Sequence, residues 1–574
     1  MLRKICKPKF LLAIIILIAS LLRLYKLTVN PVSLFGDELD LGYQAYSILK
    51  TGQDYYGNFI PIHFHSLAEW RTPLYLYSAV PTVAIWGISP LGVRIPAAIF
   101  GILGVLAIYL LAKELTKNET VALISAGVLT ISPWHLQYSR AGFEATQMIF
   151  FLLLGLWLFF KCLNTKNGKY LWLSVTCLVL TPWVYSTAKL FTPLLLIFLF
   201  LVYRKEILVF KKRNLIWSVV AGLIVGIPIA YSTFFGGGAQ RFSYLSVFTD
   251  PVTESTVGEA RLQDARMRGT LIAGTTPEFL DRVFHNKFTF WGTTIIRNYL
   301  QPFSTEFLFI QGDPDLRQSI GTGEFYKVDA VILFIGALLF FTKCKEGKTK
   351  ALILFWIIAG ILPAAITRDG GNHATRLILI LPPLIFLISY GLVEIYRLLS
   401  PKYKLIFVAS YLFLLALGFA GYEHTYWVHY PYNSERWWHA GFEESFDYIK
   451  SVDSQYDRIF ISMQGEPAYI FFAGWYEYPP VKWHQGFPFK STYVDGFGRI
   501  SYIDKYYFGS PNDGASIYDL SKYITSKDLY MAVAKEVGPN LILSPGNVPN
   551  GLKLLKAVAY PSGEPAYYIF TKSQ

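Results

Sequence analysis

Long apolar blocks alternate with short polar connections along most of the chain. Phe10–Leu22, Ala122–Ile131 and Ala330–Phe341 are three examples. Several blocks approach the roughly 20 residues that a helix needs to cross a bilayer, and flanking aromatic, Lys and Arg side chains extend the shorter ones. The pattern predicts about eleven spans, at residues 10–25, 94–112, 120–138, 147–160, 170–186, 190–203, 215–232, 329–342, 351–366, 377–396 and 405–421. The expected fold class is a polytopic α-helical membrane protein.

The connections between the blocks alternate in charge. Every second connection carries a cluster of Lys and Arg, as at 204–213 and 343–350. Because short cytoplasmic loops retain positive charge, these connections are assigned to the cytoplasm. The N-terminus is then cytoplasmic, and three long segments are external: 26–93, 233–329 and 422–574.

Composition supports this picture and excludes other classes. The chain is 53% hydrophobic with a mean hydropathy of +0.37, which is too apolar for a soluble enzyme of 574 residues. The net charge of +13 could indicate nucleic-acid binding, but the basic residues gather in the cytoplasmic loops, so no nucleic-acid partner is expected. Basic residues before the first block resemble a signal peptide. Without an Ala-x-Ala site, and with Arg23 and Lys26 following, a retained anchor is predicted.

The chain divides into a transmembrane domain, 1–421, and an external soluble α/β domain, 422–574. In the second domain, Phe442–Val452 has helical spacing, while Tyr456–Met463, Asn540–Ser544 and Tyr567–Lys572 are candidate strands. Within the first external loop, Thr72–Trp86 is apolar but contains two prolines, which favours a helix lying in the membrane interface.

Adjacent carboxylates follow the first apolar block. Asp37 and Glu38 stand at the start of a helical pattern that continues to Leu49. They could be a pair that stabilises the helix N-terminus, or one could be a general base at the membrane surface. Residues alone leave both interpretations open.

Two further polar clusters lie on the same external side. Arg71, two residues before a proline, could hold a phosphate through its guanidinium fork or anchor an interfacial helix. Arg140 and Glu144 are four residues apart, so they are expected on one helical face, where an ordinary ion pair is the alternative to a functional one.

A polar loop between two late apolar blocks makes the fourth cluster. It carries Arg368, Asp369, His373 and Arg376, and its Gly-Gly pair indicates a turn. Arg376 is expected to begin the next helix, where an anion could dock, although a solvated loop would look similar. All four clusters lie at helix ends on one membrane face, which favours a functional site.

Metal binding is not indicated. The four cysteines have no metal-ligand spacing, and His63 and His65 in a loop are weak evidence. No cofactor is therefore predicted with certainty, and a divalent metal remains possible.

Together these motifs resemble the GT-C superfamily of integral-membrane glycosyltransferases. The likeness is to bacterial protein O-mannosyltransferases and to aminoarabinose transferases of lipid A, and it runs from about Leu11 to Leu398. It rests on the stretches FGDELDLGYQAYSIL, RTPLYLY, VRIPAAIFGILGVLAIYLLAKEL, SPWHLQYSRAGFEA, QGDPDLRQSIGTGEFY and HATRLILILPPL. The order and shared membrane side of these motifs make the combination more specific than any member.

The resemblance implies roles for particular residues. Asp37, with Glu38 beside it, would be the catalytic base. Arg71 would contact the donor phosphate, with His373 and Arg376 from the late loop. Arg140 and Glu144 would be supporting or acceptor-side residues. Two positions depart from the pattern: Thr72 replaces the first proline of a Pro-Pro pair, and Trp70 stands where some relatives carry an acid.

The expected reaction follows from the predicted location. Nucleotide sugars are not expected outside the membrane, so the donor would be a polyprenyl-phosphate sugar delivered in the bilayer. Asp37 would act as general base, with inversion, and the acceptor would be a hydroxyl of a protein, lipid or glycan. The C-terminal domain would bind the acceptor or act as a lid. The alternatives are a polyprenyl-diphosphate glycan ligase or polymerase, and a lipid or sugar transporter.

Overall fold

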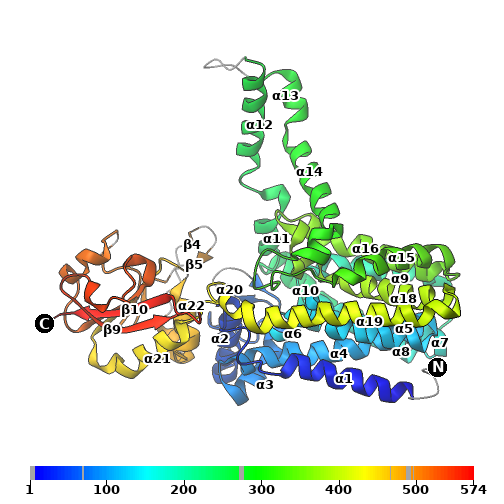
Figure 1. The fold of residues 1–574 in the computed structure, drawn as a ribbon, viewed down its shortest axis with the longest axis horizontal. Coiled ribbons are helices and arrows are strands. Elements are labelled where there is room, and N and C mark those ends of the chain that lie inside the picture. Colours follow the sequence, from blue (N-terminus) through cyan, green and yellow to red (C-terminus); the bar gives the residue numbers. More distant parts are fainter. Residues whose placement is uncertain are drawn as a thin grey trace.

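A computed structural model describes residues 7–66, 70–269, 277–465, 467–486, 493–494, 497–498, 500–512 and 514–573. Long helices form a bundle, and a mixed sheet with its helices lies at one end of that bundle (Figure 1). Helix α1 begins at the opposite end. The two parts match the expected fold class: a helical membrane protein with a C-terminal α/β region.

Helices coincide with all eleven predicted spans. The bundle contains α1 (Pro8–Leu24), α4 (Pro90–Thr116), α5 (Glu119–Ile131), α6 (Pro133–Arg140), α7 (Ala145–Thr165), α8 (Lys169–Val184), α9 (Ala188–Ile207), α10 (Lys212–Phe235), α15 (Lys327–Lys343), α16 (Gly347–Ala365), α17 (Ala374–Leu377), α18 (Leu381–Leu398), α19 (Pro401–His424) and α20 (Tyr430–Asn433). Within the described ranges, six helical stretches are long and apolar enough to cross a membrane: Pro90–Thr116, Ala145–Thr165, Lys212–Phe235, Gly347–Ala365, Ala374–Leu398 and Pro401–Asn433. The chain is thus a multi-pass membrane protein, and the number of crossings stays a prediction.

One predicted span is divided. Residues 120–138 form two helices, α5 and α6, because Pro133 lacks an amide hydrogen and cannot continue the preceding helix. Ser132 stands at the break as the N-cap of α6. The short α6 is buried along its whole length. It carries polar side chains that a bilayer would not tolerate but that neighbouring segments can bind.

The first external segment folds against the end of the bundle. It comprises α2 (Gly36–Thr51), the two-residue strands β1 (Phe64–His65) and β2 (Trp70–Arg71), and α3 (Pro73–Trp86). The strands pair antiparallel, with Phe64 opposite Arg71. The predicted helix over 72–86 is confirmed as α3, and its place in the membrane interface stays a prediction.

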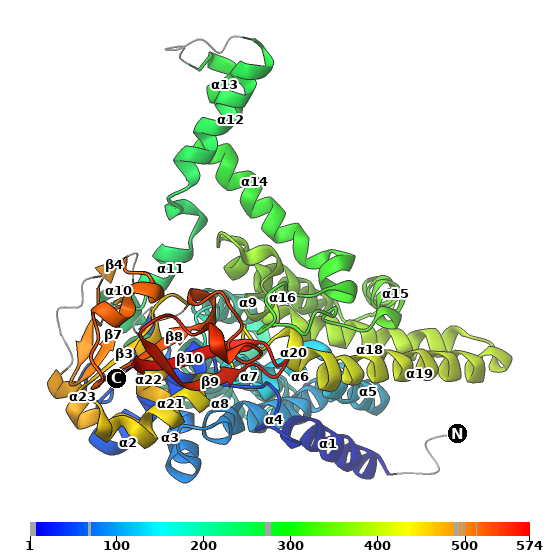
Figure 2. The same cartoon turned by 60° about the vertical axis from the view of Figure 1, so that its left-hand side comes forward.

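A helical arm projects from the second external segment. It contains α11 (Gln240–Leu245), α12 (Thr253–Met267), α13 (Phe279–Phe284) and α14 (Lys287–Leu300), with a 3-10 turn at Val247–Thr249. In two views 60° apart, the arm stands across the direction of the bundle helices (Figures 1 and 2). The chain returns through a 3-10 turn, Gln301–Phe303, and a π-helical turn, Glu306–Ile310.

The C-terminal region contains a six-stranded sheet in the order β6-β7-β3-β8-β10-β9. Strand β3 pairs parallel with β7 and β8, and the other pairs are antiparallel. The elements are α21 (Phe442–Val452), β3 (Arg458–Ile461), α22 (Ala468–Trp475), α23 (Pro480–Gly486), β4 (Tyr493–Val494), β5 (Phe497–Gly498), β6 (Tyr502–Ile503), β7 (Tyr506–Phe508), β8 (Asp528–Val533), β9 (Leu552–Ala559) and β10 (Pro565–Lys572).

The predicted strand over Asn540–Ser544 is wrong. These residues form a turn, because the Asn540 side chain accepts hydrogen bonds from the amides of Ile542 and Leu543. The predictions of a helix at 442–452 and of strands within 456–463 and 567–572 are confirmed.

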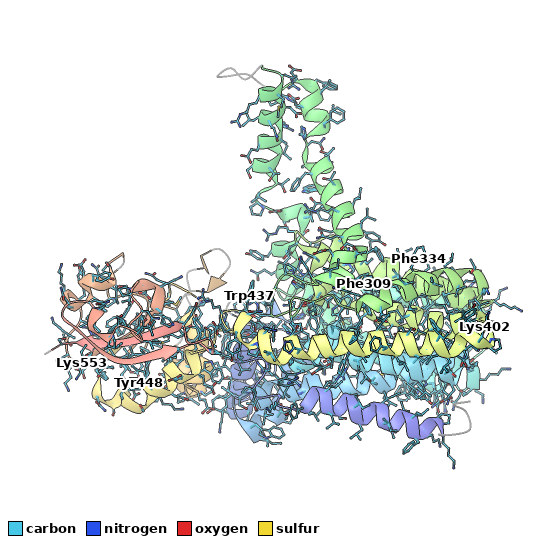
Figure 3. The ribbon with its side chains drawn as sticks, viewed as in Figure 1. Phe309, Phe334, Lys402, Trp437, Tyr448 and Lys553 are labelled. Carbon is cyan, nitrogen blue, oxygen red and sulfur yellow. The ribbon has the colours of Figure 1, made fainter. Side chains whose placement is uncertain are left out.

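The C-terminal region packs directly on the first external segment. Helix α22 lies against α2, and the Tyr43 hydroxyl donates a hydrogen bond to the backbone oxygen of Tyr478 at 2.9 Å. Trp437 lies where the bundle meets the sheet, whereas Lys402 lies at the other end of the bundle (Figure 3). The C-terminal region therefore covers the end of the bundle that carries α2.

Candidate polar site at the covered end of the bundle

Asp37 and Glu38 occupy the first turn of α2, so the expectation of a helix N-terminus is confirmed. Successive residues of a helix point about 100° apart, and these two carboxylates consequently enter different surroundings. The side chain of Asp37 is 60% exposed, whereas that of Glu38 is fully buried. Only Asp37 is accessible to a substrate.

Arg71 joins Asp37 to a second carboxylate. Its Nη2 atom lies 2.7 Å from Asp37 Oδ1, and its Nε atom lies 3.2 Å from Asp40 Oδ2. The β1–β2 hairpin holds Arg71 in this position, and its side chain is only 7% exposed. The structure therefore brings together the two residues that the sequence predicted as base and phosphate ligand.

Asp40 also binds Tyr55. The Tyr55 hydroxyl donates to Asp40 Oδ1 at 2.6 Å, and both side chains are buried. Burial, together with the negative charge of Asp40, raises the pKa of Tyr55 well above its ordinary value, so the phenol keeps its proton. Asp40 is thus oriented by Tyr55 on one side and Arg71 on the other.

Glu38 forms a buried ion pair with Arg94 of α4. Arg94 donates through Nε to Oε1 and through Nη2 to Oε2, each at 2.8 Å, which is a bidentate arrangement. The Gly142 amide also donates to Glu38 Oε1 at 2.6 Å, and Arg94 reaches the backbone oxygen of Pro31. This pair connects α2, α4, the loop before α2 and the turn after α6.

Arg140 and Glu144 do not share a helical face, contrary to the prediction. Helix α6 ends at Arg140 and α7 begins at Ala145. The intervening Gly142 passes so close to α4 that a β-carbon there would lie 2.7 Å from Val93 Cγ1. This close approach, and the hydrogen bond from the Gly142 amide to Glu38, keep the residues between Arg140 and Ala145 out of helical geometry.

Arg140 is instead a buried structural cation. It donates to the backbone oxygens of Leu22 and Asn30 and to the hydroxyl of Tyr426. Its guanidinium also lies over the Tyr426 and Trp427 rings. The residue ties the end of α1 to the segment after α19.

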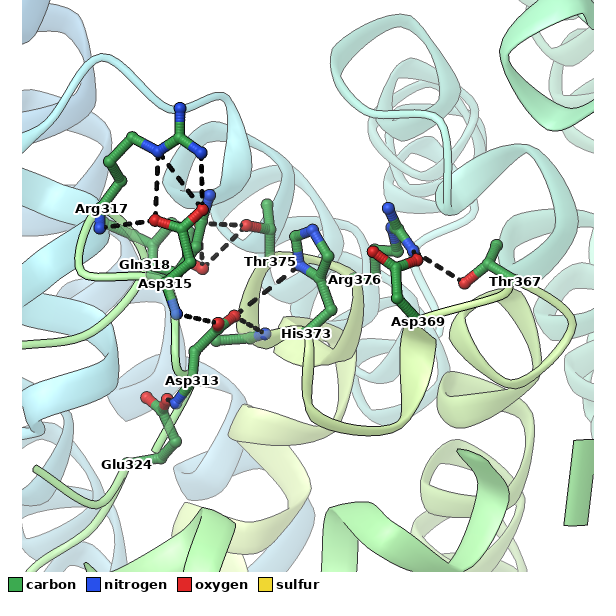
Figure 4. A network of polar contacts seen from close by, with 12 residues as sticks. Asp313, Asp315, Arg317, Gln318, Glu324, Thr367, Asp369, His373, Thr375 and Arg376 are labelled. Atoms are coloured by element: carbon green, nitrogen blue, oxygen red, sulfur yellow. Dashed lines mark hydrogen bonds and ion pairs between the residues drawn. The ribbon is translucent and has the colours of Figure 1, made fainter. Parts of the chain in front are cut away.

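His373 and Arg376 belong to a second polar network (Figure 4). Arg376 Nη1 contacts Asp369 Oδ1 at 2.5 Å and the Thr367 hydroxyl at 2.9 Å. His373 Nδ1 lies 3.9 Å from Asp313 Oδ2, which also accepts from the Ala374 amide at 2.8 Å. The stretch 311–326, singled out by resemblance, therefore packs on the late loop.

Arg376 was expected to begin the next long helix, but the structure shows that it does not. It lies in the four-residue α17, followed by a 3-10 turn at Ile378–Ile380, and the long α18 starts at Leu381. Pro382 and Pro383 lack amide hydrogens, so the carbonyls before them cannot receive α-helical bonds. One of these carbonyls, that of Leu379, accepts from Trp356 Nε1 instead.

Two acids in the second network are held away from water. Burial raises the pKa of Asp313 to about 7, although the Ala374 and Asp315 amides oppose the shift. Burial, with the charge of Asp313, raises the pKa of Glu324 well above its ordinary value. Asp369 behaves differently: burial acts to raise its pKa, but Arg376 outweighs this and lowers it.

Helix α6 connects the two networks. The Tyr138 hydroxyl contacts the Thr375 hydroxyl at 2.8 Å, and Trp134 Nε1 donates to the Ala374 oxygen. The turn that follows α6 reaches Glu38 through Gly142. Arg317, which belongs to the second network, also contacts the start of α2 and the segment before α21: its guanidinium lies over the rings of Phe35 and Trp437.

Sequence reasoning missed Asp40, Arg94, Asp313 and Glu324. Asp40 had a signal, since it lies three residues after Asp37 and so on a neighbouring part of the helix surface. Arg94 had one too, because a lone charge at the start of a 23-residue apolar pattern requires a buried partner. Across the described part of the chain, no group of three His, Cys, Asp or Glu side chains is arranged to hold a metal ion.

Comparison with known sequences identifies related proteins. Residues 71–231 match the family described as dolichyl-phosphate-mannose-protein mannosyltransferase. An uncharacterized protein of Aquifex aeolicus is 26% identical over 205 residues, which are 35% of this chain and 40% of that protein. The "Putative mannosyltransferase YkcB" of Bacillus subtilis is 28% identical over 169 residues, 28% of this chain and 22% of that protein. The matches thus span less than half of either relative.

Comparison with solved structures tests the fold. ArnT from Cupriavidus metallidurans, bound to undecaprenyl phosphate, matches with a TM-score of 0.52 and 11% identity, covering 98% of this chain and 97% of that chain. An Archaeoglobus fulgidus oligosaccharyltransferase matches 81% of this chain and 61% of its own, with a TM-score of 0.46 and 15% identity. The ArnT likeness extends over the whole chain and shows a shared fold.

Fold, family match and motif order agree. In fold the chain resembles the integral-membrane glycosyltransferases of the GT-C type, and residues 71–231 match a mannosyltransferase family.

Proposed function

We propose that the protein transfers a sugar from a polyprenyl-phosphate donor to an acceptor hydroxyl at the extracytoplasmic membrane face, with inversion of the anomeric carbon. One observation carries the proposal: the exposed carboxylate of Asp37 lies 2.7 Å from the guanidinium of Arg71 at a covered end of the bundle. A base and a phosphate-binding cation are the two groups that this reaction needs most.

In the proposed reaction, Asp37 accepts the proton of the acceptor hydroxyl as its oxygen attacks the anomeric carbon. The bond from that carbon to the phosphate oxygen breaks on the opposite face, and polyprenyl phosphate leaves. Arg71 stabilises the negative charge that develops on the departing phosphate. A single carboxylate acting as base, without a covalent intermediate, gives inversion.

Donor binding would also release the base. Arg71 Nη2 contacts Asp37 in this structure, so an arriving phosphate competes with Asp37 for the same guanidinium. Asp40 would keep its contact with Arg71 Nε and preserve the orientation of the side chain. Asp37 would then be free to accept a proton only when the donor is in place.

Arg376 and His373 remain proposed donor-side residues. Asp37, Asp40 and Arg71 together carry one net negative charge, so binding the anionic phosphodiester of the donor, which becomes a phosphate dianion as it leaves, calls for a further cation. Arg376 is a candidate, because its partner Asp369 is 64% exposed and can move away. For Arg140 and Glu144, we propose only a supporting role, and for Glu38 a role in positioning α2 through Arg94.

The C-terminal region is proposed to bind the acceptor or act as a lid. Helix α22 lies on α2, and a β-carbon at Gly36 would be 3.8 Å from the ring of Phe471. In this proposal, the acceptor approaches Asp37 along this contact.

The decisive experiment measures release of polyprenyl phosphate from a panel of polyprenyl-phosphate hexoses. It uses purified protein, the Asp37→Asn variant, and a crude acceptor extract. We expect sugar-selective release that falls at least about a hundredfold in Asp37→Asn, because a general base contributes 10²–10⁴-fold. Asp519→Asn, which changes an exposed carboxylate of the C-terminal region, serves as the control.

Two outcomes would contradict the proposal. Full activity of a folded Asp37→Asn protein would remove Asp37 from the chemistry. Absence of release from every monophosphate donor would direct attention to a diphosphate-linked glycan ligase or to a transporter.

A further inference from the structure

Helix α14 is amphipathic in the reverse sense to a helix of a water-soluble protein. Its buried side chains include the polar Thr294 and Asn298, and Asn298 donates to the backbone oxygen of Thr367 at 2.6 Å. Its large apolar side chains point outward: Phe288, Ile296 and Leu300 are 60–69% exposed. Water would penalise this arrangement, whereas lipid favours it.

The apolar surface continues along the arm. In α13, Phe279 is 79% exposed, and Leu280 and Phe284 are also exposed. Fully burying one such side chain is worth about 1.5–3 kcal/mol, so leaving the whole surface in water would be strongly unfavourable. Something of low polarity must cover α13 and α14.

The C-terminal end of the arm contacts the bundle beside an exposed apolar residue of α16. The Tyr299 hydroxyl donates to the backbone oxygen of Ile358 in α16, at 2.9 Å. Ile358 is itself an exposed apolar residue, and α16 is one of the helices long enough to cross the membrane. The C-terminal half of α14 therefore lies at the depth of the bilayer.

The direction of the arm agrees with this placement. The arm stands across the bundle helices in both views, and it leaves the bundle in the half that is nearer the C-terminal sheet (Figures 1 and 2). Because bundle helices run along the membrane normal, an element across them runs along the membrane plane.

We infer that α12, α13 and α14 form an arm that lies in the leaflet on the site side of the membrane, with the apolar face of α13 and α14 among the acyl chains. The sequence from 250 to 303 contains six acidic and six basic residues, so attraction to anionic headgroups does not drive the contact. Insertion of apolar side chains does, and a zwitterionic bilayer suffices. The inference is independent of the reaction proposed above.

The test places a fluorescent label on single cysteines of the full chain, after its native cysteines are replaced by serine. Phe288→Cys and Ile296→Cys report the apolar face. Arg297→Cys is the matched control, because nine residues place it roughly 180° around α14 from Phe288. The labelled proteins are placed in nanodiscs of phosphatidylcholine that carry nitroxides on the acyl chains.

We expect the nitroxides to quench the labels at 288 and 296 about threefold more than the label at 297, with no change when anionic lipid is added. Equal quenching at the three positions, or none at 288 and 296, would overturn the inference. The labels could instead be shielded from water and unquenched, in a particle of twice the mass. That result would overturn the inference and show that a second copy of the chain, not lipid, covers the apolar face. Phe279→Cys is a second reporter if a label on α14 prevents folding.

Discussion

Asp37 and Glu38 show how one residue of helix rotation separates two environments. Asp37 is exposed beside Arg71, while Glu38 is sealed against Arg94. The sequence predicted that carboxylates at this point matter, and it predicted Arg71. It could not distinguish the two acids, because which one faces Arg94 depends on how α2 packs against α4.

The contact between Asp37 and Arg71 could not be predicted from the sequence either. It joins residues 34 positions apart and depends on the β1–β2 hairpin, whose strands are too short to give a periodic signal. Asp313 and Glu324 were hidden for another reason, since only tertiary burial distinguishes them from ordinary loop acids.

Removing the Glu38 carboxylate should destabilise the protein. Glu38→Ala leaves the Arg94 guanidinium buried without its carboxylate, and such a loss typically costs about 3–5 kcal/mol. We expect a lower melting temperature in detergent, whereas Asp37→Asn should melt close to the unchanged protein. Equal melting of both variants would contradict a structural role of the Glu38–Arg94 pair.

The buried Asp313 predicts a pH dependence of stability. The folded protein keeps this proton up to about pH 7, whereas the unfolded chain releases it near the ordinary value of 3.8. The folded state therefore binds more protons in that window, and stability is lost as the pH rises through it.

We expect the melting temperature to fall between about pH 4 and pH 7, and to fall less in Asp313→Asn. Asparagine keeps an oxygen that can accept from the Ala374 amide, so the comparison isolates the charge. A variant with the same pH profile as the unchanged protein would show that Asp313 does not titrate in this range.

At the scale of elements, apolar periodicity predicted the positions of the helices well and their interruptions poorly. All eleven predicted spans coincide with helices, because length and hydrophobicity suffice to select them. The breaks at Pro133 and before Pro382 follow from missing amide hydrogens and had visible signals. The break after Arg140 did not, since it depends on the close passage of Gly142 over α4.

The close approach of Gly142 to α4 can be tested by substitution. A β-carbon at Gly142 would lie 2.7 Å from Val93 Cγ1 and 3.1 Å from Glu38 Cγ, so Gly142→Ala should cost about 1–3 kcal/mol of unfolding free energy. A β-carbon at Gly127 in α5 would meet no atom within 4 Å outside the backbone of its own helix, and Gly127→Ala should be neutral or slightly stabilising. Thermal melting of both variants is the measurement, and equal melting would contradict the packing argument.

On the scale of the whole molecule, the contact of the C-terminal region with α2 is the arrangement that the sequence did not reveal. The sequence predicted a separate α/β region, but its docking depends on contacts between residues such as Tyr43 and Tyr478, which are 435 positions apart. A β-carbon at Gly474 in α22 would lie 2.7 Å from Leu39 Cδ2. This glycine allows the two helices to approach closely.

Gly474→Val should loosen this contact. We expect faster amide exchange in α2 and a tenfold to hundredfold loss in the proposed sugar transfer, because misplacing catalytic groups by about 1 Å can cost a factor of about a hundred. Gly546→Ala is the control, since no atom lies within 4 Å of its added carbon. Unchanged exchange in α2 would show that the interface tolerates the larger residue.

The docking of α22 on α2 also determines when the site can exist during biosynthesis. The hydrogen bond from Tyr43 to Tyr478 joins residues 435 positions apart. At a ribosome rate of roughly 5–20 residues per second, α2 must wait more than about 20 seconds for its cover to be made. A nascent chain that already holds Asp37 and Arg71 therefore has an open, incomplete site, which closes only after all the helices of the bundle have been made.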